Sequence, residues 1–248
     1  MALREDLEKQ GNWLFRWRSY SPLLGVPVFI IAIRQSGIIE IKFGDNVGDF
    51  WGSCAIVVSF LGFIVRCITA GYAPRGTSGR NAQSQVAEVL NTTGMYSITR
   101  NPLYLGNFII VLGVALFIQV WWLVVLVCFG FWFYYERIIF TEEEFLRGKF
   151  KNQFMEWAEK TPIVFPRFRN WKKPELGFSF KTVLRREFST FLSIVVTFFL
   201  LEIVTNFLTQ KRFTLRISWV IFFVTSLGIY LTFFILKKRT KLLNVSGR

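Results

Sequence analysis

The chain alternates long apolar runs with shorter polar and charged segments. A helix needs roughly 20 apolar residues to cross a hydrocarbon core of about 30 Å, and only helices and closed barrels satisfy their own backbone in lipid. Six apolar runs approach this length, two of them short, so the pattern predicts an all-α polytopic membrane protein with about six transmembrane helices. The predicted spans are Ser21 to Ile33 or a little beyond, Phe50 to Tyr72, Leu103 to Phe117, Val120 to Tyr135, Phe188 to Leu208 and Ile217 to Leu236.

The third and fourth spans share one unbroken apolar stretch, so the break between them must be inferred. Gln119, followed by Trp121 and Trp122, is the only polar and interfacial punctuation in this stretch. We predict a tight helical hairpin there. One very long tilted helix is the alternative.

A different pattern follows the fourth span. From Glu142 to Trp157, large apolar residues recur every three to four positions with Lys and Glu between them, which predicts an amphipathic helix at the cytoplasmic surface. Lys160-Thr161-Pro162 is expected to end it. Residues 1–20 are predicted to form a cytoplasmic interfacial segment, with Trp13 and Trp17 as membrane anchors.

Lysine and arginine residues are distributed unevenly between the spans. With a cytoplasmic N-terminus, the cytoplasmic side receives most of them, including the dense block from 137 to 186 and Lys237-Lys238-Arg239. This asymmetry predicts that both termini are cytoplasmic. We expect one membrane domain over 1–248, in which 184–240 supplies two additional transmembrane helices.

Composition supports a membrane protein and narrows its chemistry. The chain is 52% hydrophobic and 18% aromatic, and its net charge is +14. Because the basic residues sit between apolar segments, anionic lipid headgroups are a nearer partner than nucleic acid. The chain contains no histidine, which removes zinc hydrolases and Ser-His-Asp enzymes from consideration. The three cysteines lie in apolar runs without CxxC spacing, so no metal site is expected.

Two polar patches flank the predicted hairpin and form a candidate site. Pro102 can occupy the first helical turn, with Asn101 as the capping residue. Gly106 leaves room for close packing or for a ligand, and Arg137 can pair with a carboxylate such as Glu142. The full candidate set is Tyr96, Arg100, Asn101, Pro102, Tyr104 and Gly106 on one side, and Arg137 with the run Glu142 to Glu144 on the other.

These residues resemble the isoprenylcysteine carboxyl methyltransferase family, which includes related bacterial lipid methyltransferases. Members carry Gly-x-Tyr-x-x-x-Arg-His-Pro-x-Tyr-x-Gly, then a helical hairpin, then an Arg followed by a Glu-Glu pair. The likeness covers residues 93–166, the expected catalytic core. Two departures stand out: Asn101 replaces the family histidine, and Arg137 lies one residue further from the glutamates than in some members. The matching positions are Gly94, Tyr96, Arg100, Pro102, Tyr104, Gly106, Glu142, Glu143, Leu146 and Phe150.

The resemblance implies a membrane-embedded methyltransferase that uses S-adenosylmethionine in a pocket open to the cytosol. It also implies a lipid substrate that enters from the bilayer. Arg137 and Glu142 would border the methyl-transfer point. The implied cofactor-binding residues are Tyr96, Arg100, Asn101, Pro102, Tyr104, Leu105, Gly106 and Glu143.

The missing histidine bears on the acceptor atom. A phosphate or carboxylate is already ionised at pH 7 and needs no base, whereas an amine must first lose a proton. O-methylation is therefore favoured over phospholipid N-methylation, and the arginines Arg16, Arg18, Arg75 and Arg80 favour phosphate over carboxylate. The N-terminal block and the Gly79-Arg80-Asn81 loop resemble bacterial lipid A 1-phosphate methyltransferases, which implies a bacterial inner membrane.

Three alternatives stay open at this stage. With the same fold, the chain could methylate the carboxylate of a prenylated cysteine or the amine of a phospholipid. From another class, it could be a noncatalytic membrane protein or transporter subunit that kept the helices. The arginines themselves are also what positive-inside topology alone predicts.

Overall fold

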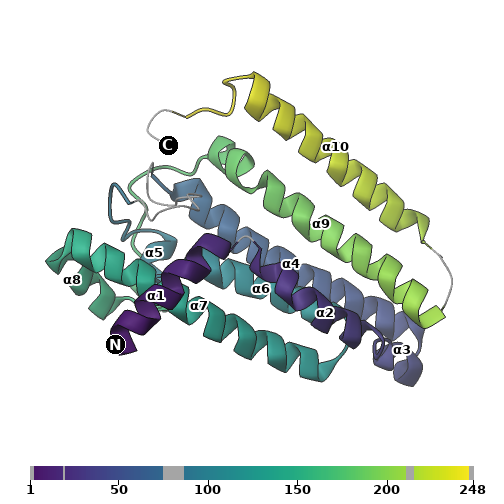
Figure 1. Ribbon diagram of the computed structural model, residues 1–248. Coiled ribbons are helices and arrows are strands. Elements are labelled where there is room, and N and C mark those ends of the chain that lie inside the picture. Colours follow the sequence, from purple (N-terminus) through teal and green to yellow (C-terminus); the bar gives the residue numbers. More distant parts are fainter. Residues whose placement is uncertain (1–2, 19, 75–86, 211–214, 246–248) are drawn as a thin grey trace.

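A computed structural model describes residues 3–18, 20–74, 87–210 and 215–245 of the chain. All regular structure in these ranges is helical (Figure 1). The elements are α1 (Leu3–Trp17), α2 (Ser21–Ile33), α3 (Ile38–Phe43), α4 (Asp45–Tyr72), α5 (Met95–Ile98), α6 (Pro102–Phe117), α7 (Trp121–Phe150), α8 (Asn152–Lys160), the 3-10 turn η1 (Phe168–Asn170), α9 (Phe180–Gln210) and α10 (Ile217–Arg239).

The predicted fold class is confirmed. Within the described residues, five helical segments are long and apolar enough to cross a membrane. α6 is a further apolar helix of 16 residues, shorter than these five. The long segments are Leu23–Phe43, which includes the turn between α2 and α3, Asp45–Tyr72, Trp121–Phe150, Phe180–Leu208 and Ile217–Arg239.

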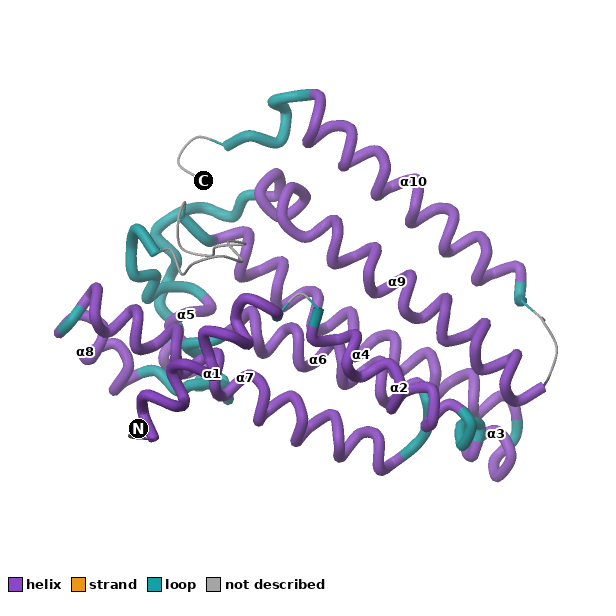
Figure 2. Tube along the Cα trace, viewed as in Figure 1, coloured by secondary structure: helices purple, strands orange, loops and turns teal. Residues whose placement is uncertain are grey.

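The long helices run side by side, with α4 near the middle of the bundle (Figure 2). α4 packs against α6 and α9, α6 packs against α7, and α10 packs against α9 at the outer edge. α1 lies across α7. The main apolar core, which includes Ala115, Leu123 and Phe198, fills the space between α2, α6, α7 and α9.

Small residues bring α4 and α6 into close contact. A Cβ atom at Gly62 would lie 2.6 Å from the carbonyl oxygen of Gly106, and one at Gly113 would lie 2.2 Å from Oγ of Ser59. The Ser59 hydroxyl donates a hydrogen bond of 2.8 Å to the Ile110 carbonyl. Since lipid gives little hydrophobic drive between helices, such close backbone packing is the main source of their association.

The hairpin predicted at Gln119 is confirmed, and the alternative of one long helix is wrong. α6 ends at Phe117 and α7 begins at Trp121, with Gln119 in a left-handed conformation at φ 64°. The Gln119 side-chain oxygen accepts a hydrogen bond of 3.1 Å from the Ile39 backbone N–H of α3. That contact supports a conformation that non-glycine residues seldom adopt.

The separate amphipathic helix predicted from Glu142 to Trp157 is wrong in its boundaries. α7 continues without interruption to Phe150, because about half of the residues after Tyr135 are the good helix formers Glu, Arg, Leu and Lys and none is a proline. The break comes at Lys151, whose φ is 46°, and α8 starts at Asn152. One rigid helix therefore carries both the fourth span and the Glu142-Glu143 pair.

Candidate active site at one end of the bundle

The two motif regions meet at one end of the bundle, which we call the site end. It comprises the end of α4, α5, the start of α6, the last turns of α7, and α8 (Figure 1). Residues 160–172 return along the segment before α6. The Arg100 N–H donates to the Pro162 carbonyl and the Arg167 N–H to the Ile98 carbonyl, both at 2.9 Å. These bonds fix a segment that has little regular structure of its own.

Gly94 begins this fixed segment, and the backbone conformation at this position requires a glycine. Its φ of 58° lies in the region that side chains disfavour, and a Cβ there would meet Pro174 at 3.1 Å. The Gly94 N–H donates to the Lys172 carbonyl at 2.9 Å. The backbone conformation therefore explains why a glycine occupies this position of the signature.

The two consecutive glutamates of α7 pair with two residues of the first motif. The Tyr104 hydroxyl donates a hydrogen bond of 2.9 Å to Oε1 of Glu142. Arg100 Nε lies 3.3 Å from Oε1 of Glu143, and these side chains are only 13% and 19% exposed. Within the described residues, neither of these two buried atoms has a hydrogen bond of good geometry. An unsatisfied buried pair of this kind needs an explanation.

Aromatic side chains surround these pairs. The Tyr104 and Tyr135 rings lie 4.7 Å apart, and Tyr135 stacks on Phe131 at 4.1 Å. The Trp157 ring N–H donates to the Tyr96 carbonyl at 3.0 Å, which ties α8 to α5. Burial raises the pKa of the Tyr96 phenol, and the negative charge of Glu142 raises it further.

Asn101 stands at the predicted capping position, but its side chain does not cap α6. It is the residue before Pro102, yet its side-chain N–H donates to the Ile163 carbonyl at 3.1 Å. Its backbone carbonyl accepts from the Leu105 N–H at 3.0 Å. The side-chain amide of Asn101, which replaces the family histidine, thus binds residues 160–172 and does not cap the start of α6.

The predicted pairing of Arg137 with Glu142 is wrong. Arg137 Nε donates to the Gln10 side chain of α1 at 2.9 Å, and its Nη1 donates to the Phe133 carbonyl at 2.7 Å. Residues five apart in a helix point about 140° away from each other, since each residue turns the helix by about 100°. Glu142 therefore faces α6, whereas Arg137 faces α1.

Gly106 faces α4, and the Arg66 side chain fills the space beside it that a ligand could have occupied. A Cβ at Gly106 would lie 2.6 Å from Cγ of Arg66. The packing explanation for this glycine is therefore the one that the structure supports.

The four arginines predicted to bind substrate do not form one group. Arg18 stacks over the Phe15 ring at 3.7 Å and lies close enough to Glu142 and Tyr104 to interact electrostatically with both. Arg16 is exposed on α1, beside Glu8 and Lys9. Arg75 and Arg80 lie outside the described residues.

Sequence reasoning missed a charged pair just behind these residues. Arg66 of α4 and Glu187 of α9 form a bidentate ion pair, and Arg66 also donates to the Asn107 side chain. Charged residues within or beside apolar runs are rare and mark function. That signal was available in the second predicted span and just before the fifth.

Comparison with known families supports a membrane methyltransferase of a lipid or phospholipid. Residues 55–153 match the family model described as phospholipid methyltransferase, so the matched region runs from α4 to the start of α8. The match includes both motifs of the candidate site. Among the described residues there is no group of three or more side chains suited to hold a metal ion.

Two curated relatives carry names from metal resistance. The chain is 31% identical over 120 residues to the nickel-cobalt-cadmium resistance protein NccN of Alcaligenes xylosoxydans xylosoxydans, a match that covers 48% of this chain and 54% of NccN. It is 36% identical over 78 residues to the cobalt-zinc-cadmium resistance protein CzcN of Cupriavidus metallidurans, covering 32% of this chain and 36% of CzcN. The chain thus spans about half or less of these relatives. No solved structure matches it.

Proposed function

We propose that the chain is an S-adenosylmethionine-dependent methyltransferase that transfers a methyl group to a lipid phosphate. The main support for this proposal is that Glu142 and Glu143 of α7 contact the Tyr104 and Arg100 side chains of the first motif. These residues are distant in sequence and match two separate motifs of the resembled family. Their convergence at the end of apolar helices suits a charged cofactor beside a membrane.

The residues present fit the chemical groups of this cofactor. S-adenosylmethionine supplies an electrophilic methyl group on a sulfonium. Arg100 can bind its carboxylate and Glu143 its ammonium group, and the buried atoms of this pair that lack good hydrogen bonds are then satisfied. Glu142 and the faces of the Tyr104 and Tyr135 rings can stabilise a positive sulfonium.

The acceptor is proposed to be an oxygen of a phosphate. A phosphate is ionised at neutral pH, so the chain needs no base to activate it, in keeping with the absence of histidine. Orientation and desolvation of the reacting atoms would supply most of the acceleration. Arg18 interacts electrostatically with Glu142, and we propose it as the described arginine that holds this anion.

The proposed lipid is lipid A, methylated on its 1-phosphate at the cytoplasmic face of a bacterial inner membrane. This proposal rests on the likeness of the N-terminal block and of the Gly79-Arg80-Asn81 segment. It includes cytoplasmic N- and C-termini, as the distribution of basic residues predicts. Arg75 and Arg80 are proposed to contribute to phosphate binding.

Two rival functions have specific observations in their favour. The description of the matching family favours transfer to another phospholipid, including N-methylation. The names of the two relatives favour a role of the membrane protein in metal resistance, with or without catalysis. Methylation of a prenylated cysteine is a further same-fold rival.

Cofactor binding separates the enzyme from a noncatalytic protein. Purified protein in detergent should bind S-adenosylmethionine in isothermal titration calorimetry, and the Glu143→Ala variant should not. No heat of binding for the wild-type protein would contradict every methyltransferase function.

Lipid analysis then tests the acceptor. Mass spectra of lipid extracts from cells with the gene should show phosphorylated lipid heavier by one CH₂ group than in cells without it. Arg80→Ala should lower this product without changing cofactor affinity. An unchanged lipid A spectrum together with a methylated phospholipid amine or prenylated protein would contradict the choice of lipid.

A further inference from the structure

A buried ion pair joins the candidate site to a helix outside the matched region. Arg66 Nε lies 2.9 Å from Oε2 of Glu187, and Arg66 Nη2 lies 3.0 Å from Oε1. The two side chains are 14% and 5% exposed. Arg66 Nη1 donates a further hydrogen bond of 2.6 Å to the Asn107 side-chain oxygen. One guanidinium therefore binds side chains of α9 and α6 at once.

Such a pair is a poor way to stabilise a helix bundle. Removing two charges from water costs several kcal/mol per ion, and well-packed apolar residues of similar volume often serve as well or better. α4 and α9 are otherwise mostly apolar along their membrane-spanning lengths, and the pair lies at the charged start of α9, next in sequence to Arg185 and Arg186. A specific requirement of the site is a better explanation for this pair.

Arg66 contacts α6 directly behind the residues of the site. Its side chain packs against Gly106, where a Cβ would lie 2.6 Å from Arg66 Cγ, and it bonds the adjacent Asn107. Tyr104 lies in the same two turns of α6 and donates to Glu142. A shift of these turns would therefore move the Tyr104 hydroxyl relative to α7.

α9 fixes Arg66 from the opposite side. α9 packs against α4 and lies between α4 and α10 (Figure 1). Its Glu187 binds both Nε and Nη2 in the planar geometry that favours arginine over lysine. The guanidinium is left with one orientation, in which Nη1 points at Asn107.

We propose that Arg66, oriented by Glu187, is a positioning residue that sets the start of α6 so that Tyr104 meets Glu142. The last helical hairpin, which lies outside residues 55–153, then completes the catalytic unit through Glu187. This inference rests on the proposed methyltransferase function and assigns a role to α9 within it. Arg66 acts through α6 and does not itself touch the reactants.

A double replacement separates positioning from stability. Arg66→Met combined with Glu187→Met removes both charges and leaves no unpaired ion, so its melting temperature should stay close to that of the wild type. Its kcat for lipid methylation should fall by about tenfold or more, since displacements of about 1 Å reduce turnover strongly. The KM for the lipid and the Kd for S-adenosylmethionine should change much less. Wild-type kcat in a folded double variant would overturn the positioning role.

A milder variant decides the matter if the double variant does not fold. Asn107→Leu keeps the ion pair and removes the hydrogen bond of Arg66 to α6, together with a hydrogen bond between Asn107 and Tyr135. Asn107→Leu should lower kcat more than Tyr135→Phe, which loses the second bond alone, with little change in either substrate affinity. Wild-type kcat in Asn107→Leu would likewise overturn the proposal.

The chain offers a matched control at the other end of the bundle. Arg216 also forms an ion pair, in which its Nη1 donates to both carboxylate oxygens of Asp49, at 2.8 and 2.9 Å. Replacing both of these residues by Met should leave kcat unchanged, and an equal loss there would contradict a specific role for Arg66. Wild-type protein that binds no S-adenosylmethionine contradicts the methyltransferase function itself, whereas retained kcat in the variants contradicts the positioning role alone.

Discussion

The two ends of the bundle use the same ion-pair chemistry in different surroundings. At the site end, Arg66 and Glu187 are 14% and 5% exposed, and Arg100 and Glu143 are 13% and 19% exposed. At the opposite end, Arg216 and Asp49 are 58% and 51% exposed. An exposed pair adds little to stability, whereas a buried pair fixes the geometry of its neighbours at an energetic cost. The difference indicates where the molecule holds side chains in fixed positions.

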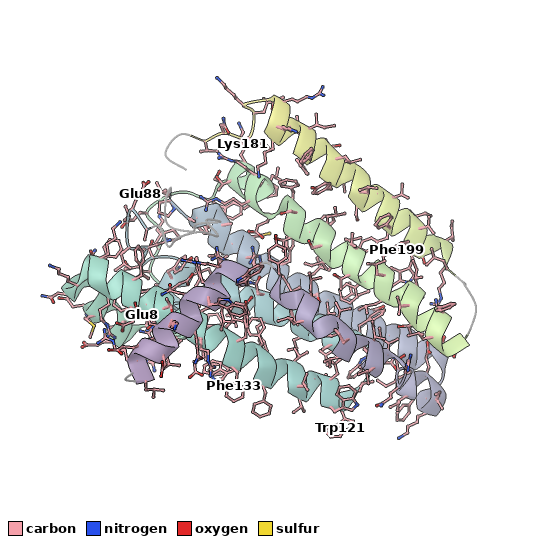
Figure 3. All side chains as sticks on the ribbon, viewed as in Figure 1. Glu8, Glu88, Trp121, Phe133, Lys181 and Phe199 are labelled. Carbon is pink, nitrogen blue, oxygen red and sulfur yellow. The ribbon has the colours of Figure 1, made fainter. Side chains whose placement is uncertain are left out.

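The first part and the last turns of α7 differ in a similar way. Trp121 and Phe133 point away from the neighbouring helices, as lipid-facing residues do, and both are exposed (Figure 3). Glu142 and Glu143, further along the same helix, face the first motif. A single helix thus serves as a membrane span over its first part and as one wall of the candidate site over its last turns.

The largest expected effect belongs to Glu143. Replacing it by Ala removes the carboxylate beside Arg100, and methyl transfer should fall by roughly 100-fold or more, as for other oriented charged groups in active sites. Radiolabelled methyl transfer to lipid measures this. Glu136→Ala is the control, because Glu136 lies on the same helix and is exposed. Near-normal transfer in a folded Glu143→Ala variant would show that the cofactor residues are misplaced.

A smaller loss is expected for Tyr104→Phe. This variant keeps the ring but loses the hydrogen bond to Glu142, and a bond to a charged group is worth about 1.5–3 kcal/mol. Turnover should fall by about tenfold or more, and the melting temperature should fall by a few degrees because the same bond contributes to stability. Tyr230→Phe on α10 is the matched control. Equal turnover in the two variants would mean that the Tyr104–Glu142 bond serves the fold alone.

The two N-terminal arginines should differ by a few-fold. Arg18 lies beside Glu142 and Tyr104, whereas Arg16 is exposed on α1. Arg18→Ala should raise the KM for the lipid about threefold or more, and Arg16→Ala should have almost no effect, because exposed charges interact weakly. Steady-state kinetics in mixed micelles distinguishes the two. Identical KM values would remove Arg18 from the proposed phosphate contacts.

The smallest effect is expected at the opposite end. Arg216→Ala breaks an exposed pair, so it should lower the free energy of unfolding by less than about 1 kcal/mol and leave methyl transfer unchanged. Thermal unfolding and the transfer assay measure both. A large loss of transfer would erase the distinction between the two ends.

The apolar pattern by itself indicated the membrane-spanning helices and the hairpin. Runs of apolar residues and one polar break at Gln119 specify them locally, because each span needs only enough apolar length and an internally satisfied backbone. The same reasoning placed the end at Lys160 correctly but the start of the amphipathic segment incorrectly. Nothing in a three-to-four-residue period indicates whether α7 stops at Tyr135 or continues to Phe150.

The partners of the charged residues were decided only by the tertiary structure. Tyr104 and Glu142 are 38 residues apart in sequence, and Arg66 and Glu187 are 121 apart. Which of them meet depends on the register and rotation of packed helices, as where glycine contacts between α4 and α6 bring Arg66 to Asn107. Arg137 and Glu142 looked like partners in sequence, but the turn of the helix directs them to different neighbours. Composition can supply charges to a membrane protein, while only packing decides which of them become pairs.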